Sequence, residues 1–261
     1  MLKVRIIPTL LWKRLGLVKG VGFNSWRRIG PVLPAIRIYN QREVDELILV
    51  DIAAQETGDE PDYESVLEYG QDCFVPLTVG GGILRIEQVQ KMLRSGADKV
   101  AINTGACLDP NLVSKVAGRF GTQCVVASVD VRSSEAGWEC YSHSGRQPTG
   151  REVVNWVREL EDRGAGEILI TSIERDGTMS GYDLDLIATV VSSVKVPVIA
   201  SGGAGSYQHM VDAVIQAGAS AVAAASMFHF TEQTPAEANK ILGNAGIPVR
   251  HIFSNAFEGE K

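Results

Sequence analysis

Three aspartates lie where apolar stretches of the sequence end, and a carboxylate in such a place can transfer protons. Asp51 and Asp130 end two of these stretches, and Asp176 lies in the segment Glu174-Arg-Asp-Gly-Thr. A carboxyl group buried among apolar residues is costly unless it is hydrogen-bonded or used, and burial raises its pKa toward neutral pH. We therefore predict that Asp130 is a general acid or base and that the other two contact substrate. The alternatives are structural: Asp130 or Asp51 could cap a helix, and Asp176 could hold a turn beside Gly177.

Glycine-rich segments with hydroxyl or amide residues nearby occur in both halves of the chain. Glycines let backbone N–H groups approach an anion closely, and Asn, Thr and Ser side chains add hydrogen bonds. The matched pair predicts two phosphate sites and hence a ligand with two phosphates, whereas the alternative is that the glycines serve only tight turns. The predicted contacts are Gly82, Asn103 and Thr104 in the first half, and Asp176, Gly177, Gly203, Ala225 and Ser226 in the second, with Thr171 and Ser201 as further polar residues.

Four charged residues directly precede or begin apolar runs. They are Arg5, Glu46, Lys99 and Glu167. Two positive and two negative charges sum to zero, which indicates a closed ring of ion pairs at one end of the fold. On the residues alone, such a ring could simply plug that end.

The elements that must position these residues alternate regularly. Apolar runs imply strands buried on both faces, as in a parallel sheet, and eight of them separated by helical patterns predict a closed (β/α)8 TIM barrel. The predicted strands are residues 4–11, 46–52, 75–79, 99–102, 125–129, 167–173, 196–200 and 221–225, and the predicted helices include 86–95, 111–120, 151–163, 184–193 and 206–217. Active sites of this fold lie at the carboxyl ends of the strands, where the three aspartates fall.

The two halves of the sequence repeat. Val75-Pro-Leu-Thr-Val-Gly-Gly-Gly is mirrored by Val196-Pro-Val-Ile-Ala-Ser-Gly-Gly. This repeat predicts two (β/α)4 half-barrels in one domain that spans residues 1–261. Residues 13–34 and 132–150 read as irregular segments, with a small hairpin predicted at residues 138–143.

Composition limits the classes of function. Hydrophobic residues make up 45% of the chain and charged residues 21%, with a net charge of -6. An acidic chain is not expected to bind nucleic acid or anionic membranes. The four cysteines and four histidines lack ligand spacing, so we expect no metal, no cofactor and no disulfide, and a cytoplasmic location. No signal peptide or membrane span is expected.

Several stretches together resemble one family, the cyclase subunit of imidazole glycerol phosphate synthase, and the resemblance runs from Arg5 to Arg250. The most specific stretches are Pro76-Leu-Thr-Val-Gly-Gly-Gly-Ile83, Gly96-Ala-Asp-Lys-Val100, Asp176-Gly-Thr178, Gly181-Tyr-Asp183 and Ser226-Met-Phe-His-Phe230.

The resemblance implies an ammonia-using enzyme. A glutaminase subunit would dock at the amino-terminal face of the barrel, and its ammonia would pass the charged ring, which then acts as a gate. Asp130 matches the family's general acid, and Lys19 matches a substrate-contacting lysine of a mobile lid. The two glycine-rich sites match the family's phosphate sites.

One departure from the family stands at the end of the first strand. The family carries its general base, an aspartate, where this chain has Leu11. A leucine cannot accept a proton, and loss of a general base costs about 10²–10⁴-fold in rate. The leucine is similar to a paralogous branch that supplies ammonia for acetamidino (amidine) groups on bacterial surface sugars (lipopolysaccharide), with an added synthetase partner. We favour this branch; the alternatives are a true cyclase subunit of histidine biosynthesis and a non-catalytic scaffold that activates the glutaminase.

Overall fold

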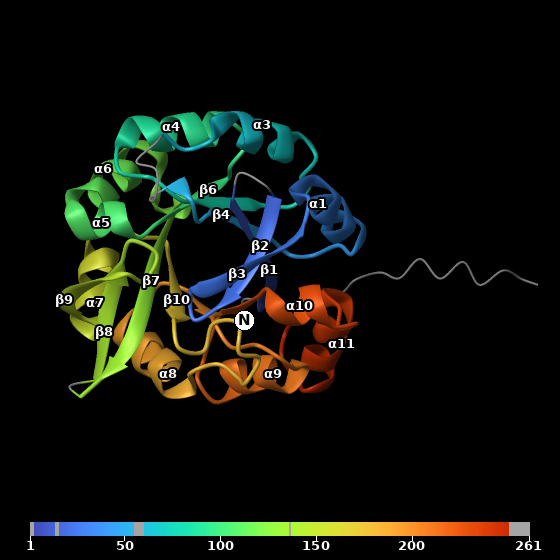
Figure 1. The fold of residues 1–261 in the computed structure, drawn as a ribbon. Helices are drawn as coiled ribbons and strands as arrows, with labels where there is room; N and C mark the ends of the chain where they lie inside the picture. The colour runs from blue at the N-terminus through green and yellow to red at the C-terminus, as the bar shows by residue number, and fades with distance from the viewer. Residues whose placement is uncertain (1–2, 14–15, 55–59, 136, 251–261) are drawn as a thin grey trace, which may run out of the picture.

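Eight parallel strands close into a barrel with helices outside it (Figure 1). The computed structural model describes residues 3–13, 16–54, 60–135 and 137–250. Neighbouring strands pair in parallel around the whole ring, and the pairings β1–β12 and β7–β10 complete it. The barrel strands are β1 (Arg5–Lys13), β4 (Leu47–Asp51), β5 (Leu77–Gly80), β6 (Lys99–Ile102), β7 (Val125–Ser134), β10 (Glu167–Ser172), β11 (Val198–Ser201) and β12 (Ala221–Ala224). The predicted (β/α)8 fold is confirmed.

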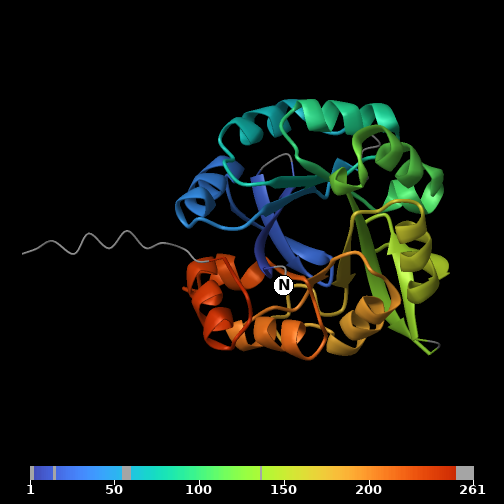
Figure 2. The ribbon, with the colours of Figure 1, turned by 180° about the vertical axis from the view of Figure 1, so that it is seen from behind.

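Helices form the outer layer on every side of the barrel, as the view from behind also shows (Figure 2). Several begin at a side chain that accepts a backbone N–H: Asp183 accepts from Leu186, and Ser206 accepts from His209, which are N-cap contacts. The helices are α1 (Val32–Gln41), α3 (Tyr63–Gln71), α4 (Ile86–Arg94), α5 (Thr104–Leu108), α6 (Asn111–Phe120), α7 (Val153–Asp162), α8 (Leu184–Ser193), α9 (Tyr207–Ile215), α10 (Ser226–Phe230) and α11 (Pro235–Asn244), with a short 3₁₀ turn at Thr122–Cys124.

Side chains alternate between two cores along each barrel strand. On β1, Ile6 and Leu10 belong to the outer core between sheet and helices, whereas Ile7 belongs to a separate core inside the barrel. The inner core is a single apolar belt, and it separates the two ends of the barrel. Its members are Ile7, Ile48, Ala101, Val126, Leu169, Ile199, Ala221 and Ala223.

The prediction of an irregular segment at residues 13–34 is wrong. Here β2 (Gly16–Val21) and β3 (Asn24–Gly30) form an antiparallel hairpin, and β2 also pairs with the end of β1. Gly22 and Phe23 both have positive φ between the paired residues Val21 and Asn24, the backbone of a two-residue type I′ turn. Phenylalanine is unusual at such a position, so the sequence carried little turn signal. The hairpin crosses the centre of the barrel in Figure 1.

The prediction of an irregular segment at residues 132–150 is wrong, and the run predicted as a small hairpin at residues 138–143 is mostly one strand of a larger antiparallel sheet. Strand β7 runs on to Ser134, and β8 (Gly137–Ser142) pairs antiparallel with it and with β9 (Gln147–Glu152). One face of an antiparallel hairpin can remain in water, so its strands can be largely polar. The polar composition of this stretch therefore did not predict strands.

Candidate active site

Two cavities open side by side at the carboxyl ends of the barrel strands. The first is lined mainly by residues of β1, β2, β7, β10, β11 and β12 and of the segments after them, and the second mainly by residues of β4, β5, β6 and β7 and of the segments after them. Five residues line both cavities: Val50, Ile52, Ser128, Asp130 and Ser144. The predicted acid Asp130 therefore lies where the two cavities meet, between the two glycine-rich segments.

The glycines of both segments adopt backbone conformations that other residues rarely take. Gly82, Gly177 and Gly203 have φ of 67°, 76° and 107°. A Cβ on Gly203 would lie 2.1 Å from the carbonyl oxygen of Gly181, and one on Gly177 would lie 2.2 Å from that of Gly20. Close approach of neighbouring backbone therefore requires glycine here, as the tight-turn alternative predicted. The same geometry leaves the glycines lining the cavities.

Ser226 adds a second kind of observation to the first cavity. Its hydroxyl oxygen is buried and has no hydrogen-bond partner within the described residues. A buried polar atom without a partner is unfavourable by about 1–3 kcal/mol, so a ligand or water is expected there. The other residues predicted beside it also line this cavity: Thr171, Asp176, Gly177, Ser201, Gly203 and Ala225.

Asp130 has the raised pKa that its burial predicted. Loss of solvation raises the pKa of its carboxyl group to about 7, a hydrogen bond from the Asn103 side chain opposes this rise, and the negative charge of Asp176 adds to it. The Asn103 Nδ2 donates to the Asp130 Oδ2 over 2.7 Å. Because β7 continues to Ser134, no helix begins after Asp130, and the helix-cap alternative does not hold.

The carboxylate of Asp51 holds the turn after β4. Its Oδ1 accepts the N–H groups of Ala53 and Ala54 over 2.8 and 3.2 Å. These contacts match the structural alternative, and Asp51 also lines the second cavity, so its contact with substrate stays a prediction.

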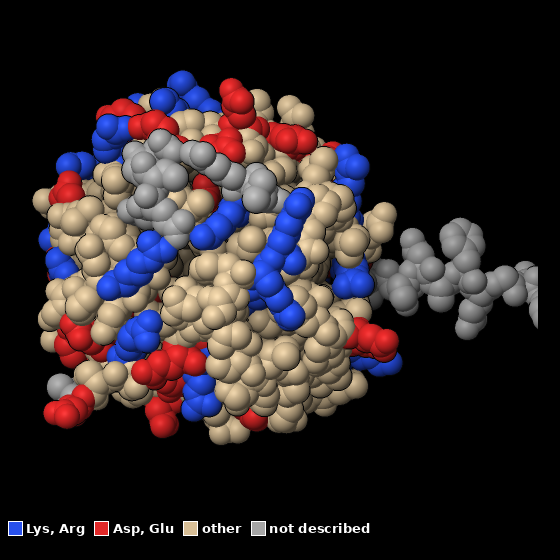
Figure 3. Space-filling model, viewed as in Figure 1, with Lys and Arg blue, Asp and Glu red and all other residues tan. Residues whose placement is uncertain are grey.

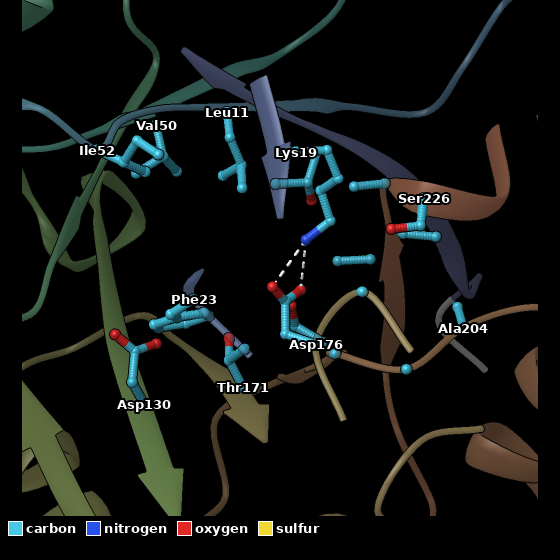
Figure 4. Close-up of a pocket in the computed structure, with 18 of the residues that line it drawn as sticks. Leu11, Lys19, Phe23, Val50, Ile52, Asp130, Thr171, Asp176, Ala204 and Ser226 are labelled. Carbon is cyan, nitrogen blue, oxygen red and sulfur yellow. Dashed lines mark hydrogen bonds and ion pairs between the residues drawn. The ribbon is translucent and has the colours of Figure 1, made fainter. Parts of the chain in front are cut away.

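Lys19 lies in a strand and not in a loop, and it lines the first cavity, whereas its predicted contact with substrate stays a prediction. It belongs to β2, its side chain is 2% exposed, and its Nζ lies 2.7 Å from both carboxylate oxygens of Asp176 (Figure 4). The Gly22 N–H also donates to the Asp176 carbonyl over 2.8 Å. A buried ammonium needs a counter-charge, and Asp176 supplies it. These contacts attach the β2–β3 hairpin to the turn that carries Gly177.

The predicted ring of ion pairs at the opposite end of the barrel is confirmed. Arg5 contacts Glu46 at 2.7 Å and Glu167 at 3.0 Å, and Lys99 contacts both glutamates at 3.0 Å. The Thr78 hydroxyl donates to Glu46 over 2.7 Å. Burial disfavours the charge on Arg5, but Glu167 and Glu46 outweigh it and raise the pKa of its guanidinium above the usual value. The apolar belt lies directly above this ring.

Residues 5–234 match the family described as "Histidine biosynthesis protein". The chain belongs to this family. A protein of Hyphomonas neptunium named imidazole glycerol phosphate synthase subunit HisF is 49% identical over 252 residues, which cover 97% of this chain and all of that relative. A protein of the same name from Gluconacetobacter diazotrophicus is 46% identical over 252 residues, covering 96% of this chain and 97% of the relative.

These relatives confirm the family predicted from the sequence. Their names give no support to the surface-sugar branch that Leu11 suggested, and they favour the cyclase alternative instead.

Leu11 nevertheless makes the mouth of this family member apolar on one side. In Figure 4, Leu11, Val50 and Ile52 lie along one side of the first cavity, and Asp130, Thr171 and Asp176 lie along the other. The cavity therefore pairs an apolar wall with a polar one.

Sequence reasoning missed two aromatic residues that line the first cavity. Phe23 from the turn of the β2–β3 hairpin and Trp26 from β3 both belong to the segment read as irregular. Phe23 and Asp130 both line the first cavity (Figure 4). The sequence signal that could have pointed to them is the presence of aromatic residues in a segment otherwise rich in glycine and arginine.

Basic side chains border the mouth even though the whole chain is acidic (Figure 3). On β3, Arg27 and Arg28 are exposed, and the Arg27 guanidinium lies 3.8 Å from the centre of the Phe230 ring. Local positive charge of this kind favours an anionic ligand.

Two further findings bear on the site. Across the described ranges, no group of three or more His, Cys, Asp or Glu side chains is placed to hold a metal ion. None of the described helices is long and apolar enough to span a membrane.

Proposed function

We propose that this chain is the ammonia-using cyclase subunit of an imidazole glycerol phosphate synthase, acting on a substrate with a phosphate at each end. The observation that carries the proposal is the position of Asp130 between two glycine-rich cavities. Sequence similarity over nearly the full length to proteins named as subunits of this synthase supports the proposal. We propose one barrel domain for residues 1–261. Residues 1–2, 14–15, 55–59, 136 and 251–261 lie outside the described part of the chain.

In this proposal one phosphate binds near Gly82 and Thr104, and the other near Gly177, Gly203 and Ser226. Backbone N–H groups and hydroxyls provide most of the contacts, and the basic rim adds favourable charge. The unpartnered Ser226 hydroxyl supports the second position.

Asp130 acts as the general acid. A carboxyl group with a pKa of about 7 is close to half protonated at neutral pH, so it can deliver a proton to a leaving oxygen when ammonia adds to a carbonyl carbon. Its place at the junction of the cavities puts it near the middle of a ligand that spans them.

A glutaminase subunit is the proposed source of ammonia, docked over the ring of Arg5, Glu46, Lys99 and Glu167. Neutral ammonia would have to pass this ring and then the apolar belt. The belt includes three alanines, Ala101 on β6 and Ala221 and Ala223 on β12, whose small side chains fill less of the barrel interior than the larger residues of the other strands.

Leu11 favours a second candidate, in which the barrel relays ammonia to a synthetase partner that forms an amidine on a surface sugar. A cyclase of the family would use an aspartate at this position, and the wall of Leu11, Val50 and Ile52 offers no group that accepts a proton. We rank this second because the names of the relatives favour the cyclase.

One assay separates the candidates. Purified chain is given the ribulosyl bisphosphate precursor of histidine biosynthesis and ammonium at high pH, and imidazole formation is followed, with Asp130→Asn as control. Cyclisation that the control loses by about 10²-fold or more supports the cyclase. No cyclisation by the wild-type chain, even with a glutaminase present, would contradict it and leave the relay or a non-catalytic scaffold.

A further inference from the structure

The side-chain amide of Asn103 uses both of its hydrogens inside the protein. Its Nδ2 donates to the Asp130 Oδ2 over 2.7 Å and to the Tyr141 carbonyl oxygen over 3.2 Å. Its Oδ1 lies 3.7 Å from the Cys107 sulfur. A carboxamide has two donor hydrogens, so this side chain has none left for a phosphate oxygen.

The Tyr141 carbonyl decides which way round the Asn103 amide lies. A backbone carbonyl can only accept a hydrogen bond, so the NH₂ group of Asn103 must be the end that faces it. The same NH₂ group faces Asp130. A donor aimed at a carboxylate favours its charged form and fixes the direction of its oxygens.

The β7–β8 hairpin holds Tyr141 in this position. Tyr141 on β8 is paired directly with Asp130 on β7. Beyond the end of β8, the His143 N–H donates to the Thr104 hydroxyl over 3.0 Å. The hairpin is therefore attached to Asn103 and to the next residue after it, at the end of β6.

We infer that Asn103 is a positioning residue that orients Asp130 and holds it ready to lose its proton, with the β7–β8 hairpin as the support of that contact. The inference deepens the proposed function, because it uses the assignment of proton transfer to Asp130. It also removes the Asn103 side chain from the predicted phosphate contacts. A barrel strand does not need to extend past the rim of the barrel as β7 does. In this inference the extension of β7 pairs with β8 and so supports the contact between the Tyr141 carbonyl and Asn103.

The test follows the titration of Asp130 itself, in the full chain and without turnover. Carbon-13 NMR of aspartate carboxyl carbons gives the pKa, and Asp130→Asn assigns the signal. The variants are Asn103→Leu, which removes both donors at similar size, and Asn103→Ala as a smaller replacement if the leucine variant does not fold. The matched control is Ser133→Ala, which removes a 2.7 Å hydrogen bond from the same hairpin to Glu174.

Loss of the Asn103 donors is expected to raise the pKa of Asp130 by about one to two units, because a hydrogen bond to a charged group is lost. Ser133→Ala should leave that pKa unchanged. Binding of inorganic phosphate, measured by calorimetry, should change less than about threefold in the Asn103 variants.

Two results would overturn the inference. One is an unchanged pKa of Asp130 in both Asn103 variants. The other is a loss of phosphate affinity of about tenfold or more in those variants, which would make Asn103 a phosphate ligand. Neither measurement depends on cyclisation, so failure of the proposed reaction and failure of this inference are separate outcomes.

Discussion

Asp130 and Leu11 lie on opposite sides of one cavity and differ in the property that matters for proton transfer (Figure 4). Asp130 has a pKa near 7 because its carboxyl group has lost most of its solvation, and the Asn103 donor limits that rise. Leu11 carries no titratable group. At the scale of single residues, the site holds a proton donor and lacks the acceptor that the family resemblance led us to expect.

Replacing Leu11 with aspartate should supply the missing base. We expect Leu11→Asp to raise the rate of cyclisation by about 10²-fold, the lower end of the usual effect of a general base. Leu11→Asn is the matched control, since it has the same shape and polarity without a basic group at neutral pH. Equal rates for the two variants in the imidazole-formation assay would show that the base is not what the site lacks.

The raised pKa of Asp130 also predicts how stability depends on pH. Between about pH 4, where an unfolded aspartate titrates, and about pH 7, the folded state holds a proton that the unfolded state has lost. The free energy of unfolding should therefore fall as pH rises through this window and be level above it. Asp130→Asn should remove this part of the pH dependence and be more stable than wild type at pH 8 by about 1–3 kcal/mol.

Urea unfolding at pH 5 and pH 8 tests this prediction. The control is Asp162→Asn, an exposed position on α7, which should keep the wild-type dependence. An Asp130→Asn variant with the same pH dependence as wild type would contradict the assigned pKa.

At the scale of elements, two hairpins added to the barrel shape its mouth. The β2–β3 hairpin brings Lys19, Phe23 and Trp26 to the first cavity, and the β7–β8 hairpin brings the Tyr141 carbonyl to Asn103. Phe23 also lies close to the turn between β8 and β9, since a Cβ on Gly145 would be 2.8 Å from its ring. The turn of the β2–β3 hairpin therefore lies against the turn that follows β8.

The Lys19–Asp176 ion pair should hold the β2–β3 hairpin in place. Lys19→Met keeps most of the side chain but leaves the Asp176 carboxylate, which is 13% exposed, without its partner. We expect amide hydrogen exchange in β2 and β3 to accelerate at least about tenfold, because one partner of a buried pair is lost.

The double variant Lys19→Met with Asp176→Asn removes both charges and is the control. It should recover part of the protection, because no buried charge remains unpaired. Unchanged exchange in the single variant would show that the hairpin is held by its backbone contacts alone.

At the scale of the whole molecule, the barrel separates a charged ring at one end from a ligand cavity at the other. The apolar belt lies between them. In the proposed function, ammonia crosses from one end to the other, so the ring should matter only when ammonia arrives from the glutaminase side.

Lys99→Met tests the proposed gate. The variant breaks both contacts of Lys99 with Glu46 and Glu167. We expect it to lower glutamine-dependent turnover by about tenfold in the presence of the glutaminase, while turnover on added ammonium stays within about twofold.

Arg37→Met is the control. It breaks a surface ion pair between Arg37 and Asp72, in which the Arg37 side chain is 60% exposed. It should change neither activity. An equal fall of both activities in Lys99→Met would assign the ring a structural role and contradict the gate.

The sequence alone was sufficient for the barrel and for the strand ends near which most of the predicted site residues lie. Runs that are apolar throughout imply strands buried on both faces, and their alternation with helical patterns leaves few possible folds. The four charges before strands predicted the ring, and the aspartate in an apolar run predicted a raised pKa at Asp130. These inferences succeed because periodicity and burial are local properties that each strand carries in its own residues.

The contacts between segments were decided by the tertiary structure. Lys19 is buried beside Asp176, and the Asn103 amide donates to Asp130. Residues 19 and 176, or 103 and 141, are far apart in sequence, and only the closed barrel with its two hairpins brings them within hydrogen-bond distance. A side chain's partner depends on which groups the fold places beside it, and no local pattern encodes that.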